Sequence, residues 1–542
     1  MSLIGLPKDV RVLITSYIRL PSDLRQVYRT CKALYEVAIP CFYTHLILRE
    51  ECDMGVLIAA FTPENAGLQH VRHATIIPAT GNYRESVPKI DNFLNMLANL
   101  LPRDILLTMT LDSAGHASED SARALKVLYK RQRNLRTLRM DSVFRAHRDW
   151  SKLAHITCLH LEIYDDKTPA FAASGILQHV PSLRHLEIHV DLEQYCRTVA
   201  VQYSKARGRA RASESLVQRL FACWPETSKP QLQLRSLQVY DLDLSLASAT
   251  LLKAIDMSRL DSLGLQKCRH SIELLRGIRP TGLPKRMNLR NLVVSGHPDC
   301  DEVRMDDAID DFLNSFAGLE HLVIMGPEQE PLRPDLSSVA KHAATLRLLY
   351  LDCVWSDWPV DKPPADEIHY HPSALCKLMP QCVRLEQIAL NTPRVLLDSD
   401  EVTALRDTGA FIGALAAAPA LRTFRMLSVP NEVDYSFDIL DLEAHRMFIK
   451  CGMASIATRY LHRMPNLHAV SIAHGEDDFV VVCDLEVAPH FYTRGQVFNA
   501  YGKSDTVALV MSKGMVQEIE PVSDILDMEP RGSRLMRYGY KT

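Results

Sequence analysis

The sequence predicts an α/β solenoid, in which helices alternate with short parallel strands, preceded by a small module of three helices. Three observations support this fold class: a hexapeptide that recurs along most of the chain, helix-like segments between its copies, and an N-terminal stretch with a different pattern. The chain has 542 residues, of which 47% are hydrophobic and 23% charged, a mixture typical of chains with a buried core. This length would ordinarily indicate several domains, but repeats can merge them into one array.

The recurring hexapeptide has the form L-x-x-L-x-L, with other aliphatic or aromatic residues as substitutes. Its eleven copies begin at Leu135, Ile156, Leu183, Leu234, Leu260, Leu289, Leu319, Leu346, Leu385, Leu421 and Leu467. Six of the ten intervals between successive starts are 21 to 30 residues, near the period of a unit made of one strand and one helix. Eleven copies in order therefore indicate a repeat rather than chance.

The segments between the hexapeptides predict helices, because their apolar residues stand three or four positions apart, as in ARALKVLYKRQ and AIDDFLNSFAG. Neither a helix nor a strand of such a unit buries its apolar face alone. Stacked units join their leucines into one core, with a parallel strand ladder on the inside of a curve and helices on the convex side. Leu263, Leu292 and Leu322 are then expected at equivalent buried positions. The alternative is an ordinary α/β domain with leucine-rich strands, which the missing nucleotide-binding turn disfavours.

These hexapeptides resemble the leucine-rich-repeat family, which implies a solenoid that binds other proteins. The family's usual Asn or Cys is matched convincingly only by Cys268, so the repeats are degenerate. We expect the array to occupy residues 49–484, with insertions near 192–231, 355–374 and 428–445. Residues 485–542 are expected to form a C-terminal cap and a polar tail.

The first 48 residues predict three short amphipathic helices, too small a set to form a core of its own. Their motifs, LPKDV at 6–10, SDL at 22–24 and TCKALY at 30–35, resemble the F-box family. The resemblance implies docking on a Skp-family adaptor, and through it on a cullin, by Leu6, Pro7, Val10, Ile14, Leu24 and Leu34. Two tryptophans of that family are absent, and Leu34 and Tyr43 stand in their places. The alternative is that these helices only cap the solenoid, as atypical terminal units do.

Side chains alternate between the two faces of a strand, so the residues interleaved with the leucines face the concave side. They predict one polar patch on that side, formed by Arg139, Asp141, His160, Glu162, His185, Glu187, His189 and Tyr240. The equivalent later positions are apolar: Val293, Val323, Met325, Ala389, Ala469 and Ala473. We expect the polar patch to contact a partner protein. The alternative is an ordinary exposed strand face, which also needs polar residues.

No sequence motif nominates a catalytic residue, a cofactor or a metal. The glycines of GQVFNAYGKS at 495–504 are seven apart, which predicts a turn rather than a phosphate loop. His369, His371 and Cys376 lack a fourth ligand at recognisable spacing and predict a structural role in a loop. The acidic residues between Asp299 and Asp311 are expected on a loop and a helix start.

Charge and cysteine usage narrow the partners and the compartment. The net charge of −3 gives no reason to expect nucleic acid or a membrane as a partner. The 13 cysteines never form a CxxC pair, which favours a reducing compartment, the cytoplasm or the nucleus. The basic run KARGRAR at 205–211 lies in the longest interval, where residues near 192–231 are expected either to loop out or to form a hidden, degenerate repeat. The run itself is expected in a solvated loop, with a nuclear address or a phosphate contact as alternatives.

Together, these observations and the two resemblances predict a protein that is not an enzyme. We expect the substrate-recognition subunit of a Skp–cullin–F-box ubiquitin ligase, which holds an unidentified protein substrate through its repeats. One alternative is a leucine-rich-repeat scaffold without a ligase connection. The other is an enzyme or enzyme regulator with an unrecognised site.

Overall fold

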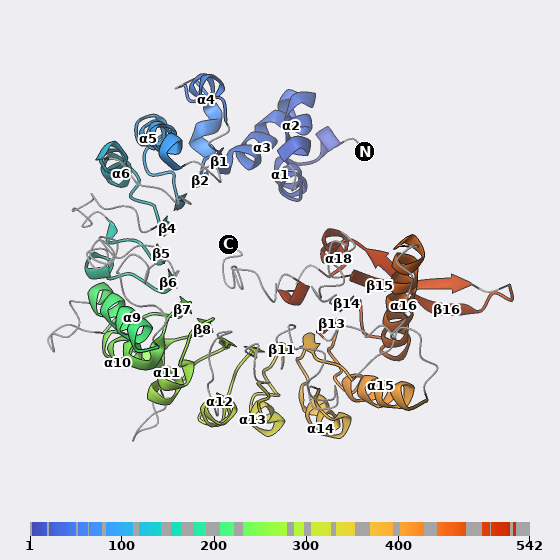
Figure 1. Cartoon of the computed structure of the whole chain (residues 1–542). Helices are drawn as coiled ribbons and strands as arrows, with labels where there is room; N and C mark the ends of the chain where they lie inside the picture. The colour runs from blue at the N-terminus through green and yellow to red at the C-terminus, as the bar shows by residue number, and fades with distance from the viewer. Residues whose placement is uncertain are drawn as a thin grey trace. The chain divides into compact units, whose positions relative to one another are not determined.

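A computed structural model describes residues 3–18, 21–49, 52–62, 64–77, 83–111, 119–141, 153–163, 177–190, 206–221, 231–278, 287–296, 305–326, 332–352, 369–393, 402–427, 442–472, 490–498, 500–520 and 524–526. The chain forms two compact units, unit 1 (Met1–Met257) and unit 2 (Ser258–Thr542). Each unit is a strand ladder with helices on its outer side (Figure 1). We call the side of each sheet opposite these helices its inner face.

Unit 1 begins with a helical module of the predicted kind. It contains η1 (Leu3–Gly5), α1 (Lys8–Ser16), α2 (Pro21–Thr30) and α3 (Lys32–Tyr43). Pro7 lies directly before α1, and its fixed φ suits the first turn of a helix. The first strand, β1 (His45–Arg49), already belongs to the ladder, so the helical module ends at Tyr43 rather than near residue 48.

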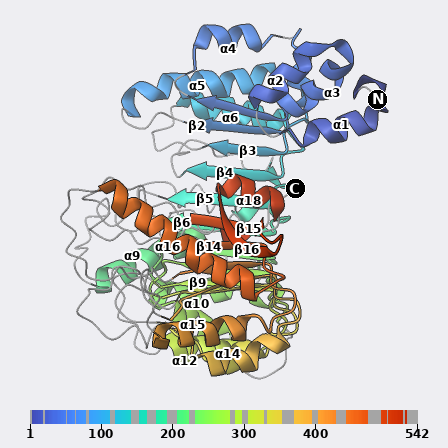
Figure 2. The same cartoon turned by 90° about the vertical axis from the view of Figure 1, so that its right-hand side faces the viewer.

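The ladder of unit 1 contains seven strands in chain order, all paired in parallel. They are β1, β2 (His73–Ile77), β3 (Thr108–Leu111), β4 (Thr137–Asp141), β5 (Cys158–Ile163), β6 (His185–Val190) and β7 (Ser236–Tyr240). The helical elements are α4 (Met54–Ala60), η2 (Ala66–His70), α5 (Tyr83–Leu100), α6 (Glu119–Arg131), α9 (Ala206–Leu220) and α10 (Leu244–Ala254). In Figure 2, β2, β3 and β4 run side by side.

Unit 2 continues the same alternation. Its parallel strands are β8 (Ser262–Gln266), β9 (Asn291–Ser295), β10 (His321–Met325), β11 (Leu348–Asp352), β12 (Gln387–Leu390), β13 (Thr423–Met426) and β14 (Ala469–Ile472). Its helical elements are α11 (Ser271–Ile278), α12 (Met305–Leu313), α13 (Leu336–Ala340), α14 (Pro372–Leu378), η6 (Met379–Gln381), α15 (Val402–Leu415) and α16 (Leu442–Arg463). The short turn η4 (Met257–Arg259) spans the division between the units.

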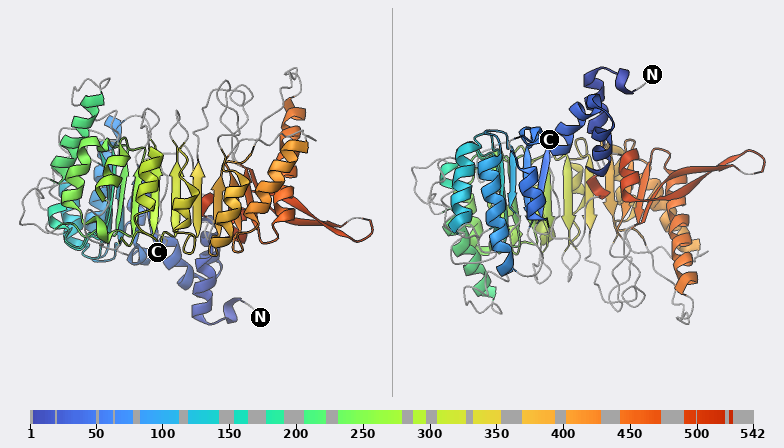
Figure 3. Two further views of the ribbon diagram at one scale, coloured as in Figure 1. Left: turned by 90° about the horizontal axis from the view of Figure 1, so that it is seen from below. Right: turned by 90° about the horizontal axis from the view of Figure 1, so that it is seen from above.

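The last part of unit 2 departs from the repeat. Strand β15 (His490–Phe498) pairs antiparallel with β14, and β16 (Ser504–Met511) pairs antiparallel with β15. This hairpin projects from the end of the ladder in both views of Figure 3. It contains the glycine-spaced segment at 495–504 and confirms the predicted turn, in which Gly502 has a φ of +72°. Helix α18 (Lys513–Ile519) and the turn η7 (Asp524–Leu526) follow.

The eleven predicted hexapeptides coincide with the eleven strands β4 to β14, which confirms an α/β repeat solenoid. Leu263, Leu292 and Leu322 are in register on β8, β9 and β10, and each is at most 1% exposed. They face the helices, and their burial is the stacking interaction that a single unit lacks. Strands β1, β2 and β3 precede the first predicted hexapeptide, so the ladder starts earlier than the leucine pattern showed.

The prediction of a basic loop at 205–211 was wrong. Residues from Ala206 onward form α9, where Ala210, Ala212 and Ser213 are buried. Ser213 accepts the backbone N–H of Asp243 at 3.1 Å, just before α10 begins. The long interval therefore contains a helix of the outer layer, which the basic residues obscured. The other two predicted insertions, near 355–374 and 428–445, lie mostly outside the described residues.

Polar side chains link neighbouring repeats of unit 2. Asp310 on α12 accepts the backbone N–H of Asp335 at 3.0 Å and the hydroxyl of Ser338, both at the start of α13. Asp306 likewise accepts the backbone N–H of Arg333 at 2.8 Å. The described part of the predicted acidic cluster thus lies at a helix start, as expected. His371 caps α14 by accepting the Ser373 N–H, a structural role as predicted, although in a helix cap rather than a loop.

Candidate functional site

The first surface of interest is the apolar face of the N-terminal helices. On η1, α1 and the residue after it, seven large apolar side chains are 38–76% exposed: Leu3, Ile4, Val10, Val12, Leu13, Ile14 and Tyr17. Apolar residues gathered in this way are unusual on a monomer and mark interaction surfaces. Among the residues predicted to contact an adaptor, Pro7, Val10 and Ile14 are exposed, and Leu6 is half-buried.

Two other residues predicted to contact an adaptor are buried inside the helical module. Leu24 and Leu34 are 6% and 8% exposed, so both side chains belong to the module's own core. Tyr43, in place of a family tryptophan, packs against Gly67, where an added Cβ would lie 2.5 Å from its ring. The structure therefore separates exposed candidate contacts on α1 from residues that hold the module together.

The second surface is the inner face of unit 1. On β6 and β7, the core residues alternate with half-buried polar residues, as the hexapeptide predicts, whereas on β5 only His160 is half-buried. The parallel register places Arg139 beside His160, His160 beside Glu187, and His189 beside Tyr240. The predicted patch is therefore assembled on four adjacent strands. The backbone of Asp141 pairs with Glu162, while its side chain lies outside the described residues.

An ion pair joins the first two strands of this patch. Arg139 on β4 donates to the carboxylate of Glu162 on β5, and their side chains are 21% and 8% exposed. Burial at this level strengthens the attraction but makes either charge costly without the other. Glu162 is consequently a structural residue as well as a candidate contact.

A chain of hydrogen bonds continues the patch. His160 Nδ1 lies 2.6 Å from Glu187 Oε2, and His160 Nε2 lies 3.1 Å from the Sγ of Cys158. Burial alone would lower the pKa of His160, but the hydrogen bonds and charges of Cys158 and Glu187 raise this pKa to about 10. Burial would raise the pKa of Glu187, and His160, with smaller contributions from Arg139 and His189, lowers it instead. At neutral pH the imidazole is thus charged and held between its partners.

A thiol, an imidazole and a carboxylate hydrogen-bonded in this order also occur at active sites with a nucleophilic cysteine. Cys158 is only 2% exposed, however, so a substrate could not reach its sulfur in this conformation. The arrangement therefore fixes His160 and Glu187 in place. Sequence reasoning missed Cys158 because it is one interleaved position before His160, where a cysteine reads as a small core residue.

Aromatic contacts complete the inner face of unit 1. The rings of His189 and Tyr240 meet edge to face with centroids 4.3 Å apart. Further toward the N-terminus, His45 and His73 stack with centroids 4.5 Å apart, on the same face of β1 and β2. Ile47, also on β1, is 50% exposed. This inner face thus presents histidines, carboxylates and an arginine that are partly exposed.

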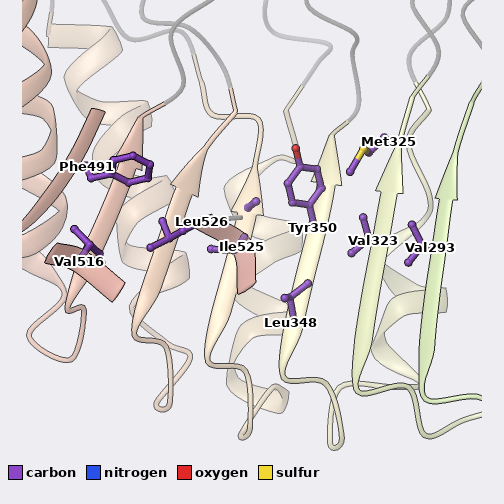
Figure 4. Packing of buried hydrophobic residues seen from close by; sticks show 11 residues of the cluster. Val293, Val323, Met325, Leu348, Tyr350, Phe491, Val516, Ile525 and Leu526 are labelled. Carbon is purple, nitrogen blue, oxygen red and sulfur yellow. The ribbon is translucent and has the colours of Figure 1, made fainter. Parts of the chain in front are cut away.

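The inner face of unit 2 differs from the prediction. The apolar positions Val293, Val323, Met325, Ala389 and Ala469 were expected to line an open concave side, but each is at most 4% exposed. They pack with Phe491, Val516, Ile525 and Leu526 from the C-terminal part of the chain (Figure 4). The face is covered because an apolar surface of this size is unstable in water. Ala473 lies outside the described residues.

Two polar residues of this face were not predicted. Gln387 on β12 and Arg425 on β13 are each 4% exposed, and both hydrogen-bond to the backbone of Ile525. Their interleaved positions in LEQIAL and LRTFRM could have singled them out, because polar residues there stand among apolar neighbours. The signal was overlooked because only the polar stretch before residue 241 was followed.

The described residues contain no group of three or more His, Cys, Asp or Glu side chains suited to a metal ion. Within that same part of the chain, no helix has the length and hydrophobicity needed to cross a membrane. On the hairpin β15–β16, the side chains of Val497, Phe498, Tyr501 and Val510 are also 53–95% exposed.

Comparisons with known proteins add little to this description. No family model and no curated protein matches the chain. Among solved structures, a chain of the crystal structure of a TLR13–ssRNA13 complex is similar, with 12% sequence identity and a TM-score of 0.27. The match covers 82% of this chain and 59% of that one. The class of protein, an α/β repeat solenoid, follows from the two strand ladders themselves.

Proposed function

We propose that the chain is a binding protein that joins two partners, one at its N-terminal helices and one at the inner face of unit 1. The N-terminal partner would be a Skp-family adaptor, and through it a cullin ubiquitin ligase, as the F-box resemblance implies. The second partner would be a protein substrate. This role requires no covalent chemistry from the chain itself and would be carried out in the cytoplasm or the nucleus.

The observation that supports the proposal most is the exposed apolar surface of η1 and α1. Val10 and Ile14 lie one turn apart on α1 and are 39% and 38% exposed. Residues at this spacing share one face of a helix, the arrangement by which a helix packs into an apolar groove. Such a surface loses contact with water when a partner covers it, which stabilises the complex.

The inner face of unit 1 suits a polar partner surface. The half-buried side chains of His185, Glu187, His189 and Tyr240 are partly open to solvent. Their positions are fixed beforehand by ring contacts and hydrogen bonds, so little side-chain entropy remains to be lost on binding. The alternative, an ordinary exposed strand face, would not require these ring contacts and hydrogen bonds.

The test is co-purification with a Skp-family adaptor. Val10→Asp combined with Ile14→Asp should weaken adaptor binding at least about 100-fold, since each buried anchor contributes on the order of 2 kcal/mol. Both side chains are exposed, so the melting temperature should stay unchanged. Val383→Asp, at a position 54% exposed in unit 2, is the matched control and should bind as the unaltered chain does.

Two results would contradict the ligase role. One is that no adaptor binds the unaltered chain, which would leave a repeat scaffold without a ligase connection. The other is that the double variant binds as tightly as the control. Capture of a substrate would be measured separately, with His185→Ala and Tyr240→Ala on the inner face of unit 1. A charge reversal at Glu162 would not test substrate binding, because it would place a second cation beside Arg139 and destabilise the fold.

A further inference from the structure

The inner face of unit 2 holds a short piece of the chain's own C-terminal part in a defined position. Ile525 and Leu526 of η7 are 0% and 3% exposed. They lie over β12 and β13, in one apolar cluster with Leu348, Tyr350 and Ala389 (Figure 4). In the described part of the chain, this segment is η7 (Asp524–Leu526).

The backbone of Ile525 is recognised at both of its polar groups. Its N–H donates to Gln387 Oε1 at 2.9 Å, and its carbonyl accepts from Arg425 Nη1 at 2.9 Å. Gln387 and Arg425 come from neighbouring strands and are both buried. Side chains that satisfy the main chain of one residue, next to pockets for adjacent side chains, form the arrangement by which proteins bind peptides.

The residue before this pair, Asp524, is acidic, and His321 is near enough to feel its charge. Burial lowers the pKa of His321 on β10, and the nearby charge of Asp524 acts against this shift. The imidazole is half-buried at the edge of the apolar cluster. The site therefore offers a main-chain clamp and a pocket for two aliphatic side chains, and in η7 the residue before that pair is acidic.

One polar atom in the pocket is not satisfied by the present occupant. The hydroxyl of Tyr350 is fully buried and has no hydrogen-bond partner among the described residues. A buried hydroxyl without a partner destabilises the state that contains it, by the lost hydration of that group.

The rest of the covering segment has anchors of its own. Glu520, at the end of α18, lies 2.6 Å from Nδ1 of His468 and 3.8 Å from Arg422. Val516 of α18 is 1% exposed beside Phe491. Helix α18 is therefore held by contacts of its own, separate from those of η7.

We propose that the inner face of unit 2 is a peptide-binding site, which η7 occupies in the isolated chain. Its ligand is a segment of another protein in which an acidic residue precedes two aliphatic residues, as in the Asp-Ile-Leu of η7. A partner of this kind displaces η7, and η7 limits access by its high local concentration. The proposal goes beyond the role proposed above and holds whether or not the N-terminal helices dock on an adaptor.

The experiment uses the full chain with a specific protease site inserted between Glu520 and Asp524. The chain is folded first and then cut, and the probe is a fluorescent peptide of residues 522–532. The cut chain should bind the probe, and the uncut chain should bind it at least 100-fold more weakly. A probe with Ile525→Asp and Leu526→Asp should not bind.

Variants of the site identify the location. Gln387→Leu removes the acceptor for the Ile525 N–H and should weaken the probe at least tenfold in the cut chain. Gln381→Leu makes the same change at an exposed position of η6 and should leave binding unaltered. A set of probes in which Ile525 or Leu526 is replaced by Val, Met or Ser should retain binding only for the apolar replacements.

Any one of the following results would overturn the proposal. If the cut chain unfolds or its melting temperature falls steeply once the fragment is removed, η7 is an integral part of the core. If the cut chain remains folded but binds no probe, the face is not a peptide site. Equal weakening by Gln387→Leu and Gln381→Leu would place binding elsewhere. Adaptor binding by the same samples shows separately whether the proposed function holds.

Discussion

The inner faces of the two units are built on the same alternation but are in opposite states. On β6 and β7 of unit 1, every second residue is half-buried, whereas on β12, β13 and β14 of unit 2 every described residue is buried. The strands differ in sequence at those positions. At the inward positions, β6 and β7 have mainly histidine, glutamate, glutamine and tyrosine. Strands β12, β13 and β14 have alanine, the short polar residues Thr423 and Ser471, and Gln387 and Arg425, while β9 and β10 add Val293, Val323 and Met325.

The comparison teaches that the hexapeptide determines only one face of each strand. The leucines must face the helices in both units, because neither element is stable without that contact. The opposite face is free to vary, and its composition decides whether it stays open or is covered. A polar inner face pairs its charges internally, whereas an apolar one needs another segment over it.

The largest expected difference is in the loss of folding stability when an acidic residue is introduced on each inner face. Val323→Asp in unit 2 should destabilise the protein by more than about 3 kcal/mol, because a carboxylate would be buried without a partner. Thr75→Asp, on the half-buried inner face of β2 in unit 1, should cost less than about 1 kcal/mol. Urea denaturation of both variants measures the difference. Equal losses would mean that the two faces are covered alike.

A smaller effect is expected from the ion pair of unit 1. Arg139→Met should cost about 1–3 kcal/mol, since it leaves the buried carboxylate of Glu162 without this cation. Combining it with Glu162→Gln should recover part of that loss, with a coupling of about 0.5–3 kcal/mol. Asp120→Asn, which breaks the exposed pair with Arg123 on α6, should change stability by less than about 1 kcal/mol. Strict additivity of the first two substitutions would contradict a structural pair.

The smallest effect concerns pH. The folded pKa of His160 is raised to about 10, above its ordinary value of 6.5, so the stability from its charged form is complete below pH 6.5 and disappears as the pH rises toward 10. Glu187→Gln should therefore lower the melting temperature more at pH 6.5 than at pH 10. Glu36→Gln, at an exposed position of α3, is the control and should show the same small shift at both values. A loss from Glu187→Gln that does not change with pH would rule out the charged pair.

Sequence reasoning could predict the ladder because leucine spacing and burial have the same physical cause. Each of the eleven hexapeptides became a strand, and the polar partners on β4 to β7 followed from alternation and register. The first three strands were overlooked although they fit the pattern with substitutes. YTHLIL at 43–48, VRHATI at 71–76 and LLTMTL at 106–111 have Tyr43, Ala74 and Met109 where leucine was sought. Helix α9 was missed because its arginines and serines obscured a face of alanine and leucine.

The cover of unit 2 could not be predicted from local pattern. Phe491, Val516 and Leu526 are far along the chain from Val323 and Tyr350, and no period links them. The clamp on Ile525 has the same origin, since its two side chains precede it by 138 and 100 residues. Such contacts join residues that are far apart in the sequence, and local periodicity gives no information about them.

The bonds from Asp310 to the start of α13 have a consequence for how unit 2 folds. A helix whose first turn is held by the preceding repeat gains stability only after that repeat has formed. Each repeat is thereby a template for the next, and order spreads along the array in steps rather than appearing everywhere at once. Opening of α12 also breaks its bonds to the backbone amides of Asp335 and Arg333. These two amides should therefore be protected against hydrogen exchange to the same extent as α12 itself.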